Sequence, residues 1–351
     1  MEIYARFSDG QGVNEEVFET LAKFAPDGHL DVLACDQHNS ILKLLTSFFK
    51  NAWAKSGDSE TFPEKPGNED VIRASQMFAR ALGKVPAAAL FNHFGFLTYS
   101  FKDLLGSQTM LIGRLEDTNF LKAEDGGLVA QLAMEPEKIA DKVDAFKTLV
   151  KVDPALPESW KSNLEWLKQI YERCRKLGKP LFNETLYNPS SALTKVQAAA
   201  KLRKVLVKIA NDFSPFGDFY KTQVPLLWIE ENGKIVNMVS PDIVRETAKI
   251  MTDIVARPIL VLSAAVDFQQ YAAQYACVCD LVSGPMCGRA YFKDPFSDPG
   301  ITTWEELEKA LENVAAPRMR QIKELARAKS KPWWCEFEWI SDKAKKLIKT
   351  S

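Results

Sequence analysis

The chain has 351 residues, of which 46% are hydrophobic and 26% are charged. This composition is too apolar for a disordered chain, and the length allows either two average domains or one α/β barrel of about 250 residues with extensions. The 45 basic and 46 acidic residues give a net charge of −1, which provides no overall field for binding nucleic acid or an acidic membrane.

No apolar run reaches the roughly 18 residues of a membrane span, and the opening MEIYARFSDG lacks the basic and apolar parts of a signal peptide. We therefore expect a cytoplasmic protein with neither membrane nor nucleic-acid partners. The six cysteines are too sparse for a disulfide scaffold, so we interpret them as reduced thiols. Cys277 and Cys279 form a C-x-C pair, but the three histidines of the chain offer few further ligands, and we expect no metal site.

Eight apolar runs bounded by turn residues predict strands. In chain order they are residues 30–36, 87–91, 109–115, 145–152, 180–186, 218–225, 258–264 and 281–289. Patterns of helical period lie between several of these runs. The clearest are residues 158–177, 192–213 and 243–254, and a segment that begins after Thr303. Ser240 with Pro241, and Thr303 with Glu306, are typical of helix starts.

Strands that alternate with helices pair in parallel through right-handed crossovers, and eight such units close a barrel. We therefore predict a single (β/α)8 TIM barrel over residues 30–328, with an N-terminal extension of residues 1–29. Residues 329–351 form a basic, Trp-rich C-terminal tail whose aromatic side chains we expect to pack on the barrel or on another subunit of a homo-oligomer. A doubly wound open sheet is the alternative, but it requires a glycine-rich turn after the first strand, and residues 34–38 contain no glycine.

Polar residues interrupt the apolar runs near the carboxyl ends of six strands, which is where the active site of a barrel lies. These residues are Asp36, Lys147, Glu184, Lys221, Ser263 and Arg289. Steps of 37 residues separate Lys147 from Glu184 and Glu184 from Lys221, which predicts similar heights on adjacent strands. A lysine in an apolar strand either pairs with a carboxylate or loses its proton, and a neutral lysine attacks carbonyl groups. The alternative interpretation is a set of structural ion pairs or outward-facing strand ends.

Six motifs in chain order are ACDQ (34–37), DAFK (144–147), PLFNE (180–184), FGDFYKTQVP (216–225), LSAAV (262–266) and CGRA (287–290). This series resembles the strand motifs of the class I tagatose-1,6-bisphosphate aldolase family, which includes bacterial sulfofructose-phosphate aldolases. The resemblance implies that Lys221 is the Schiff-base lysine, Glu184 the acid/base glutamate and Lys147 a second active-site lysine. Asp36 assists catalysis in this scheme, and Gln37 contacts the sugar.

The same resemblance implies a phosphate site after the last two strands. Ser263 and Arg289 match the phosphate-binding positions, and Ala264 and Gly288 provide backbone beside them. The chain departs from the family at His38, where arginine is usual, at Gln223, where glutamate is usual, and at Ala265, where glycine is usual. We interpret His38 as a substrate-binding residue at the mouth of the barrel.

The expected reaction is the reversible cleavage of a ketose phosphate or bisphosphate, similar to tagatose or fructose 1,6-bisphosphate, to dihydroxyacetone phosphate and an aldehyde, without a cofactor. Three alternatives stay open. The protein could be an aldolase of the sulfofructose-phosphate type, a sugar-phosphate isomerase or epimerase that uses Glu184 and Asp36 for proton transfer, or a non-catalytic sugar-phosphate sensor.

Overall fold

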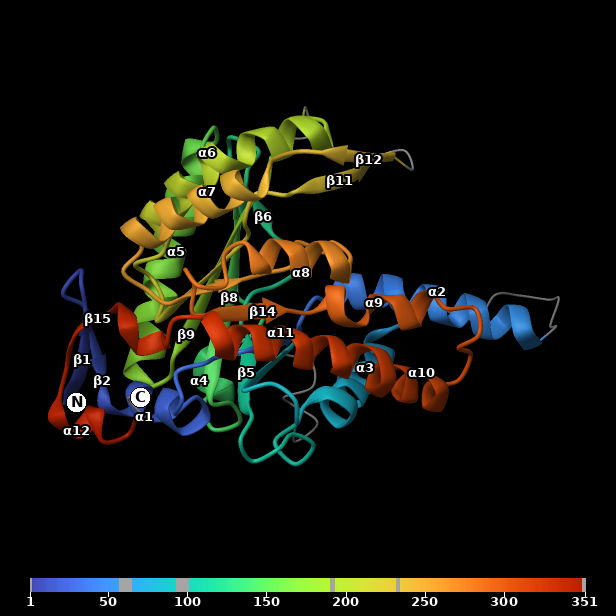
Figure 1. The fold of residues 1–351 in the computed structure, drawn as a ribbon, viewed down its shortest axis with the longest axis horizontal. Coiled ribbons are helices and arrows are strands. Elements are labelled where there is room, and N and C mark those ends of the chain that lie inside the picture. The colour runs from blue at the N-terminus through green and yellow to red at the C-terminus, as the bar shows by residue number, and fades with distance from the viewer. Residues whose placement is uncertain (1, 57–64, 93–100, 190–192, 232–233, 349–351) are drawn as a thin grey trace.

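A computed structural model describes residues 2–56, 65–92, 101–189, 193–231 and 234–348 (Figure 1). Within these residues, eight parallel strands close into a barrel. The strands are β3 (Val32–Cys35), β4 (Ala88–Phe91), β5 (Met110–Arg114), β8 (Ala145–Val152), β9 (Leu181–Tyr187), β10 (Phe219–Thr222), β13 (Ile259–Val261) and β14 (Gly284–Cys287). Each coincides with one predicted strand, so the predicted TIM barrel is confirmed and the open sheet is wrong.

Helices surround the barrel and connect its strands (Figure 1). The four predicted helices are present as α5 (Pro157–Lys176), α6 (Lys195–Phe213), α7 (Pro241–Ile254) and α10 (Trp304–Ala310). The others in the described part of the barrel are α2 (His38–Ser56), α3 (Asn68–Leu82), α4 (Pro136–Ile139), α8 (Phe268–Ala276), α9 (Arg289–Ser297) and α11 (Ala316–Lys329), with a π-helical turn, η2 (Leu311–Ala315), before α11. The side chains of Ser240 and Thr303 cap α7 and α10, as their sequence patterns predict.

Successive residues of a strand face opposite sides of the sheet, and the barrel uses the two sides differently. On β8, Phe146 and Val150 face outward and join the apolar layer between strands and helices. Ala145 faces inward and belongs to a second apolar cluster that fills the lower part of the barrel. Phe182 and Phe219 stack in that cluster with ring centroids 4.7 Å apart. The inward positions above this layer are therefore available for polar side chains.

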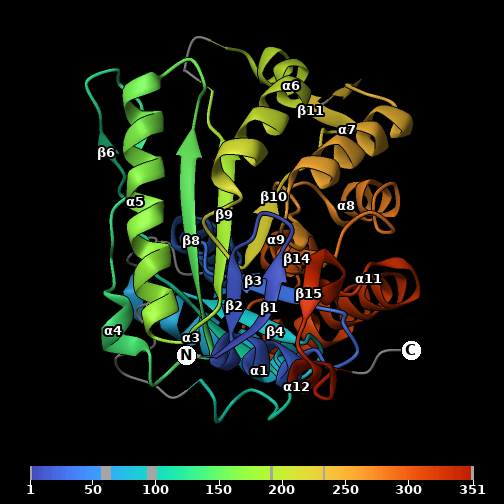
Figure 2. The same ribbon diagram turned by 90° about the vertical axis from the view of Figure 1, so that its left-hand side faces the viewer.

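The two ends of the chain close the amino-terminal end of the barrel. The strands β1 (Ile3–Phe7), β2 (Gly12–Asn14) and β15 (Phe337–Ile340) form an antiparallel sheet in the order β15-β1-β2. This sheet lies beside α1 (Glu15–Phe24) and α12 (Asp342–Lys345), so blue and red segments come together in Figure 2. Their apolar side chains belong to the same cluster as the inward residues at the starts of the barrel strands.

Trp333 anchors the C-terminal tail to the N-terminal segment. Its side chain is 1% exposed, and its indole N–H donates a hydrogen bond of 2.9 Å to the carbonyl of Ala25. The ring packs edge-on against Phe18 at a centroid distance of 5.2 Å. Trp339, in contrast, is 47% exposed. Only part of the aromatic tail is therefore used to hold the chain ends together.

Two short hairpins extend from the barrel and were not predicted. One pairs β6 (Leu121–Lys122) with β7 (Leu128–Val129), and the other pairs β11 (Trp228–Glu231) with β12 (Lys234–Asn237). No helix among the described residues is both long enough and apolar enough to cross a membrane.

Candidate active site

A cavity of about 420 Å³ opens at the carboxyl ends of the barrel strands. All ten residues that the sequence predicted for the site line it, namely Asp36, Gln37, His38, Lys147, Glu184, Lys221, Ser263, Ala264, Gly288 and Arg289. They come together because parallel strands of a barrel end at one mouth, so residues far apart in sequence reach the same space. His93, which follows the predicted strand of residues 87–91 and is therefore a candidate for substrate contact, lies outside the described residues.

Lys221 and Glu184 form the closest pair across two neighbouring strands. They are directly paired in the register of β10 and β9, and Nζ of Lys221 lies 2.9 Å from Oε2 of Glu184. Both side chains are buried. Burial raises the pKa of Glu184, but the positive charges of Lys147 and Lys221 outweigh it, so the pKa lies below its usual value. Glu184 is therefore held as a carboxylate between the two lysine side chains.

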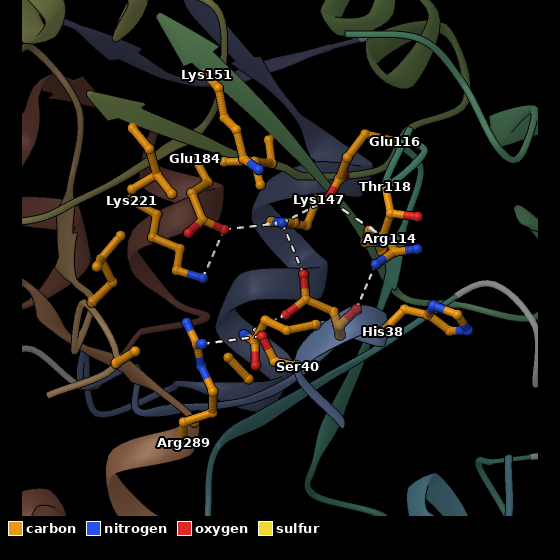
Figure 3. A pocket seen from close by; sticks show the side chains of 18 of the residues that line it. His38, Ser40, Arg114, Glu116, Thr118, Lys147, Lys151, Glu184, Lys221 and Arg289 are labelled. Carbon is orange, nitrogen blue, oxygen red and sulfur yellow. Dashed lines mark hydrogen bonds and ion pairs between the residues drawn. The ribbon is translucent and has the colours of Figure 1, made fainter. Parts of the chain in front are cut away.

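Lys147 is the centre of the ion-pair network (Figure 3). Its Nζ lies 2.8 Å from Oδ2 of Asp36, 2.8 Å from Oε1 of Glu116 and 2.9 Å from Oε2 of Glu184. Burial lowers the pKa of Lys147, but these three carboxylates raise it above its usual value. Lys147 is therefore held as an ammonium group. Because Lys147 and Lys221 both contact Glu184, repulsion between the two lysines competes with their attraction to this carboxylate.

The equal 37-residue spacing predicted adjacent strands correctly but did not give the register of Lys147. Glu184 is paired with Lys221, whereas Lys147 is paired with Phe182, two residues before Glu184. The backbone of Lys147 therefore lies one inward-facing position farther from the carboxyl ends of the strands than the backbones of Glu184 and Lys221. Its long side chain spans the difference and reaches the same carboxylate oxygen as Lys221.

Asp36 receives support from its surroundings on several sides. Its Oδ1 accepts a hydrogen bond of 2.8 Å from the amide of Gln37, and its backbone carbonyl accepts one of 2.5 Å from Arg114. Burial raises the pKa of Asp36, but the positive charges of Lys147, Lys221 and Arg114 together lower it to about 2. Asp36 is therefore ionised throughout the physiological pH range.

Arg114 and Glu116 are site residues that the sequence analysis missed. Both line the cavity, and each is at most 3% exposed. Burial raises the pKa of Glu116, although Lys147 and Arg114 act in the opposite direction. Arg114 lies near the end of the apolar run of residues 109–115, and Glu116 directly follows it, so the criterion that found the other strand-end residues could have found both.

Two buried oxygen atoms of the site have no hydrogen-bond partner among the described residues. They are Oε2 of Glu116 and Oε1 of Gln37, which flank the contact between Asp36 and Lys147. A buried polar atom without a partner is costly, and a ligand with hydroxyl groups removes that cost. The cavity is thus suited to a polar, hydroxylated ligand.

Arg289 and the backbone around it form one side of the cavity. Arg289 begins α9 and donates a hydrogen bond of 3.0 Å to Oγ of Ser40. Burial lowers the pKa of the Arg289 guanidinium, while Asp36 and Glu184 oppose this effect. The N-terminus of α9 places the positive end of the helix dipole beside the guanidinium. Both positive charges favour the binding of an anion such as phosphate.

Three small residues on this side of the cavity have unusual backbone surroundings. Gly288 lies so close to Ala34 that a Cβ would stand 2.0 Å from the carbonyl oxygen of Ala34. Ala264 and Ala265, after β13, have φ angles of 47° and 62°, a left-handed conformation that costs an L-residue about 1 kcal/mol. Ala265 therefore keeps the backbone conformation that suits glycine, although it is alanine.

His38 lies at the start of α2 and contacts two carboxamide groups. Its Nε2 lies 3.0 Å from Oδ1 of Asn68, and its Nδ1 lies 3.2 Å from Oδ1 of Asn39. These contacts fix the ring at the edge of the cavity. Among the described residues, His, Cys, Asp and Glu side chains form no group of three or more that could hold a metal ion.

A closed parallel barrel, with two lysines sharing one glutamate at the carboxyl ends of its strands, defines a TIM-barrel protein equipped for acid–base and nucleophilic chemistry. Solved structures with a similar fold include fructose-bisphosphate aldolase from Plasmodium falciparum, at 13% identity and a TM-score of 0.62, covering 94% of this chain and 99% of that one. Fructose-bisphosphate aldolase from Slackia heliotrinireducens is similar at 12% identity and a TM-score of 0.55, covering 90% and 94%.

A protein from Corynebacterium glutamicum also shares the fold, at 13% identity and a TM-score of 0.50, covering 86% of this chain and 92% of that one. No model of a known protein family matches the chain, and no curated protein matches its sequence. At these identities the likeness shows a common barrel fold. The resemblance to tagatose-bisphosphate aldolases therefore stays a prediction.

Proposed function

We propose that this protein is a class I aldolase, which cleaves a ketose phosphate or bisphosphate through a Schiff base on Lys221. The observation that carries the proposal is the buried contact of 2.9 Å between Nζ of Lys221 and Oε2 of Glu184 in the wall of the cavity. Lys147 contacts three carboxylates and stays an ammonium group, whereas Lys221 contacts one carboxylate that is placed to accept its proton. Lys221 is therefore the better nucleophile.

The first step forms the Schiff base. Glu184 accepts a proton from Lys221, and the neutral amine attacks the C2 carbonyl carbon of the ketose. Glu184 then returns the proton to the hydroxyl group of the resulting carbinolamine, which leaves as water. The product is an iminium ion that withdraws electrons from C3. Overall, this step converts one ammonium group and one ketone into one iminium ion and one water molecule.

The second step breaks the bond between C3 and C4. Glu184 accepts the proton of the C4 hydroxyl, the C4 oxygen forms the carbonyl of the departing aldehyde, and the electron pair of the broken bond converts the iminium to an enamine. Protonation of C3 by Glu184 and hydrolysis then release dihydroxyacetone phosphate and restore Lys221. Asp36 and Lys147 supply fixed charges that orient the substrate hydroxyl groups.

The remaining predicted residues bind the substrate in this scheme. Arg289, the start of α9 and the backbone of Ser263 and Ala264 bind the phosphate next to the ketone. Gln37 and Glu116 use their unpartnered oxygens to accept hydrogen bonds from hydroxyl groups. His38 lines the outer part of the cavity.

Borohydride reduction tests the proposal directly. The protein is incubated with dihydroxyacetone phosphate, reduced, digested and analysed by peptide mass spectrometry. We expect one adduct on the peptide that contains Lys221, and no adduct on that peptide in the Lys221→Met variant. An unmodified Lys221, or an adduct on Lys147 instead, would refute the assignment. An isomerase that uses Glu184 and Asp36, or a sensor protein, leaves Lys221 unmodified.

A further inference from the structure

The hairpin that follows β5 forms one wall of the cavity. Alternate residues of its first limb, Glu116, Thr118 and Phe120, all line the cavity, as expected for an extended chain with one face toward the interior. The two limbs are bridged at Glu116 and Leu132, and they pair again farther out as β6 and β7. The limbs are therefore held together from the cavity to the exposed tip of the hairpin.

Asp125, at the tip of this hairpin, holds the tip against α5, beside which β6 lies in Figure 2. Its Oδ2 accepts hydrogen bonds of 2.9 and 3.0 Å from the backbone N–H groups of Glu158 and Ser159, and its Oδ1 accepts one of 2.9 Å from Gly127. Desolvation raises the pKa of Asp125, but these backbone N–H groups lower it below its ordinary value. The N-cap residue of α5 is Leu156, whose side chain cannot accept a hydrogen bond. Asp125 therefore supplies, from another part of the chain, the cap that α5 lacks.

Two further features keep the hairpin close to α5. A Cβ at Gly127 would stand 2.0 Å from Oγ of Ser159, so this close approach of the backbone requires glycine. Asn163, which is fully buried on α5, donates a hydrogen bond of 2.7 Å to the carbonyl of Leu128 and accepts one of 2.9 Å from the N–H of Ala130. Both limbs of the hairpin are thus fixed to the same helix through its tip and its second limb.

The base of the hairpin reaches the charge network of the site. Oε1 of Glu116 lies 2.8 Å from Nζ of Lys147. Glu116 and Thr118 stand on the side of the site away from Arg289 (Figure 3). In the proposed reaction, the phosphate lies at Arg289 and the ketone carbon at Lys221, so the departing aldehyde extends toward the hairpin.

We propose that Asp125 is a positioning residue, which holds the hairpin tip on α5 and thereby places Glu116, Thr118 and Phe120 against the aldehyde half of the substrate. An isolated two-stranded hairpin is marginally stable, so its position depends on the surface to which it is docked. Asp125 itself does not line the cavity, so its effect on substrate binding is transmitted through the hairpin. This inference rests on the proposed function, and it adds a residue that acts on the reaction from outside the cavity.

Amide hydrogen exchange tests the attachment of the hairpin without reference to activity. In Asp125→Ala, we expect the amides of residues 116–132 to exchange about 3- to 10-fold faster than in the wild type, as for the loss of a helix cap. Gly127→Ala keeps the Asp125 side chain but forces the tip away from Ser159, and it should have the same effect. Thr303→Ala is the matched control, because it removes the cap of α10, a helix that does not line the cavity. Unchanged exchange of residues 116–132 in Asp125→Ala and Gly127→Ala would refute the inference.

Condensation kinetics test the effect of the hairpin on the substrate. Dihydroxyacetone phosphate is combined with D-glyceraldehyde or D-glyceraldehyde 3-phosphate, whichever reacts faster with the wild-type protein. In Asp125→Ala and Gly127→Ala, we expect KM for the aldehyde to rise about 3- to 10-fold, as for the loss of one hydrogen bond, and kcat to change by less than about twofold. KM for dihydroxyacetone phosphate should stay unchanged, because that substrate binds on the side of Arg289. Thr303→Ala should leave all three constants unchanged.

Failure of this inference is distinguishable from failure of the proposed function. Borohydride trapping on Lys221 uses dihydroxyacetone phosphate alone, so it reports on the function without involving the hairpin. If trapping succeeds and KM for the aldehyde is unchanged in Asp125→Ala, the role of Asp125 is refuted. An equal rise of both KM values, or the same rise in Thr303→Ala, would also refute it, because these patterns indicate a general loss of stability. If trapping fails, the proposed function is wrong, and the role of Asp125 toward the aldehyde is wrong with it.

Discussion

Lys221 and Glu184 face each other directly on neighbouring strands, with 2.9 Å between Nζ and Oε2. The same oxygen atom lies 2.9 Å from Nζ of Lys147. One carboxylate oxygen therefore contacts both lysines, although their positions are 74 residues apart (221 − 147 = 74). In the proposed reaction, this shared oxygen moves a proton to and from Lys221, while Lys147 keeps its own charge.

Removal of the proton acceptor at position 184 is expected to slow turnover without removing the nucleophile. In Glu184→Gln, kcat for release of dihydroxyacetone phosphate should fall by about 100- to 10,000-fold, because an amide does not accept the proton. A coupled assay with fructose and tagatose 1,6-bisphosphates measures this loss.

Borohydride should still trap dihydroxyacetone phosphate on Lys221 of Glu184→Gln, only more slowly. The Lys221→Met variant is expected to show neither turnover nor an adduct on that peptide, with an unchanged circular dichroism spectrum. Full activity in either variant would contradict the assigned roles.

Replacement of Lys147 is expected to reduce stability strongly, because it leaves Asp36, Glu116 and Glu184 without their shared cation. Breaking a buried ion pair from one side costs about 3–5 kcal/mol. Urea unfolding of Lys147→Met at pH 7.5 should show a loss of this size. The loss should be smaller at pH 5, where the uncompensated carboxylates of the variant take up protons.

The Lys249→Met variant is the control for this prediction. Lys249 and Asp253 form an ion pair of 2.9 Å on the surface, with side chains 64% and 59% exposed. Because exposed ion pairs contribute little, its unfolding free energy should change only slightly and without dependence on pH. Equal effects of the two substitutions would show that burial does not govern the contribution of Lys147.

Protonation of Asp36 is expected to lower the free energy of unfolding at acid pH. Its folded-state pKa is about 2, below the ordinary value of 3.8, so folding favours the carboxylate. The resulting stabilisation, about 2 kcal/mol, is complete above pH 3.8 and is lost as the pH falls through 2. The difference in unfolding free energy between wild type and Asp36→Asn should therefore be constant from pH 7 to 5 and shrink between pH 4 and 2. A difference that grows on acidification would mean that the sign of the pKa shift is wrong.

The tail is expected to contribute stability through one of its tryptophans. Trp333→Ala removes a ring that is 1% exposed and should lower the unfolding free energy by about 3–5 kcal/mol. Trp339→Ala, at a position 47% exposed, should change it little. Because Trp333 lies at the end of the barrel opposite the cavity, the folded Trp333→Ala protein should keep its kcat. Thermal unfolding and assays well below the transition temperature compare the two variants.

The barrel could be predicted from the sequence because each β/α unit carries its own local signals. Apolar runs of strand length, helix caps such as Ser240, and turn residues identify the units without knowledge of their neighbours. Eight parallel units have few ways to pack, so the fold follows from the count. The same topology explains why charged residues at strand ends, such as Asp36 and Arg289, were expected in one place.

The partners of those residues could not be predicted, because they depend on the register between strands. Lys147 contacts Glu116, which follows β5, and Asp36, which follows β3. The sequence separation of these residues from Lys147 does not predict either contact. The pairing of β1 with β15 joins residues at the two ends of the chain and has no local signal either.

The sequence by itself determined the number and order of the strands, the barrel, and ten of the residues that line one cavity, because local periodicity and the parallel topology suffice for these features. Only the tertiary structure decided which lysine is surrounded by carboxylates and which has one carboxylate partner. The physical reason is that the charge state of a buried side chain is set by atoms within a few ångströms, and those atoms come from different strands.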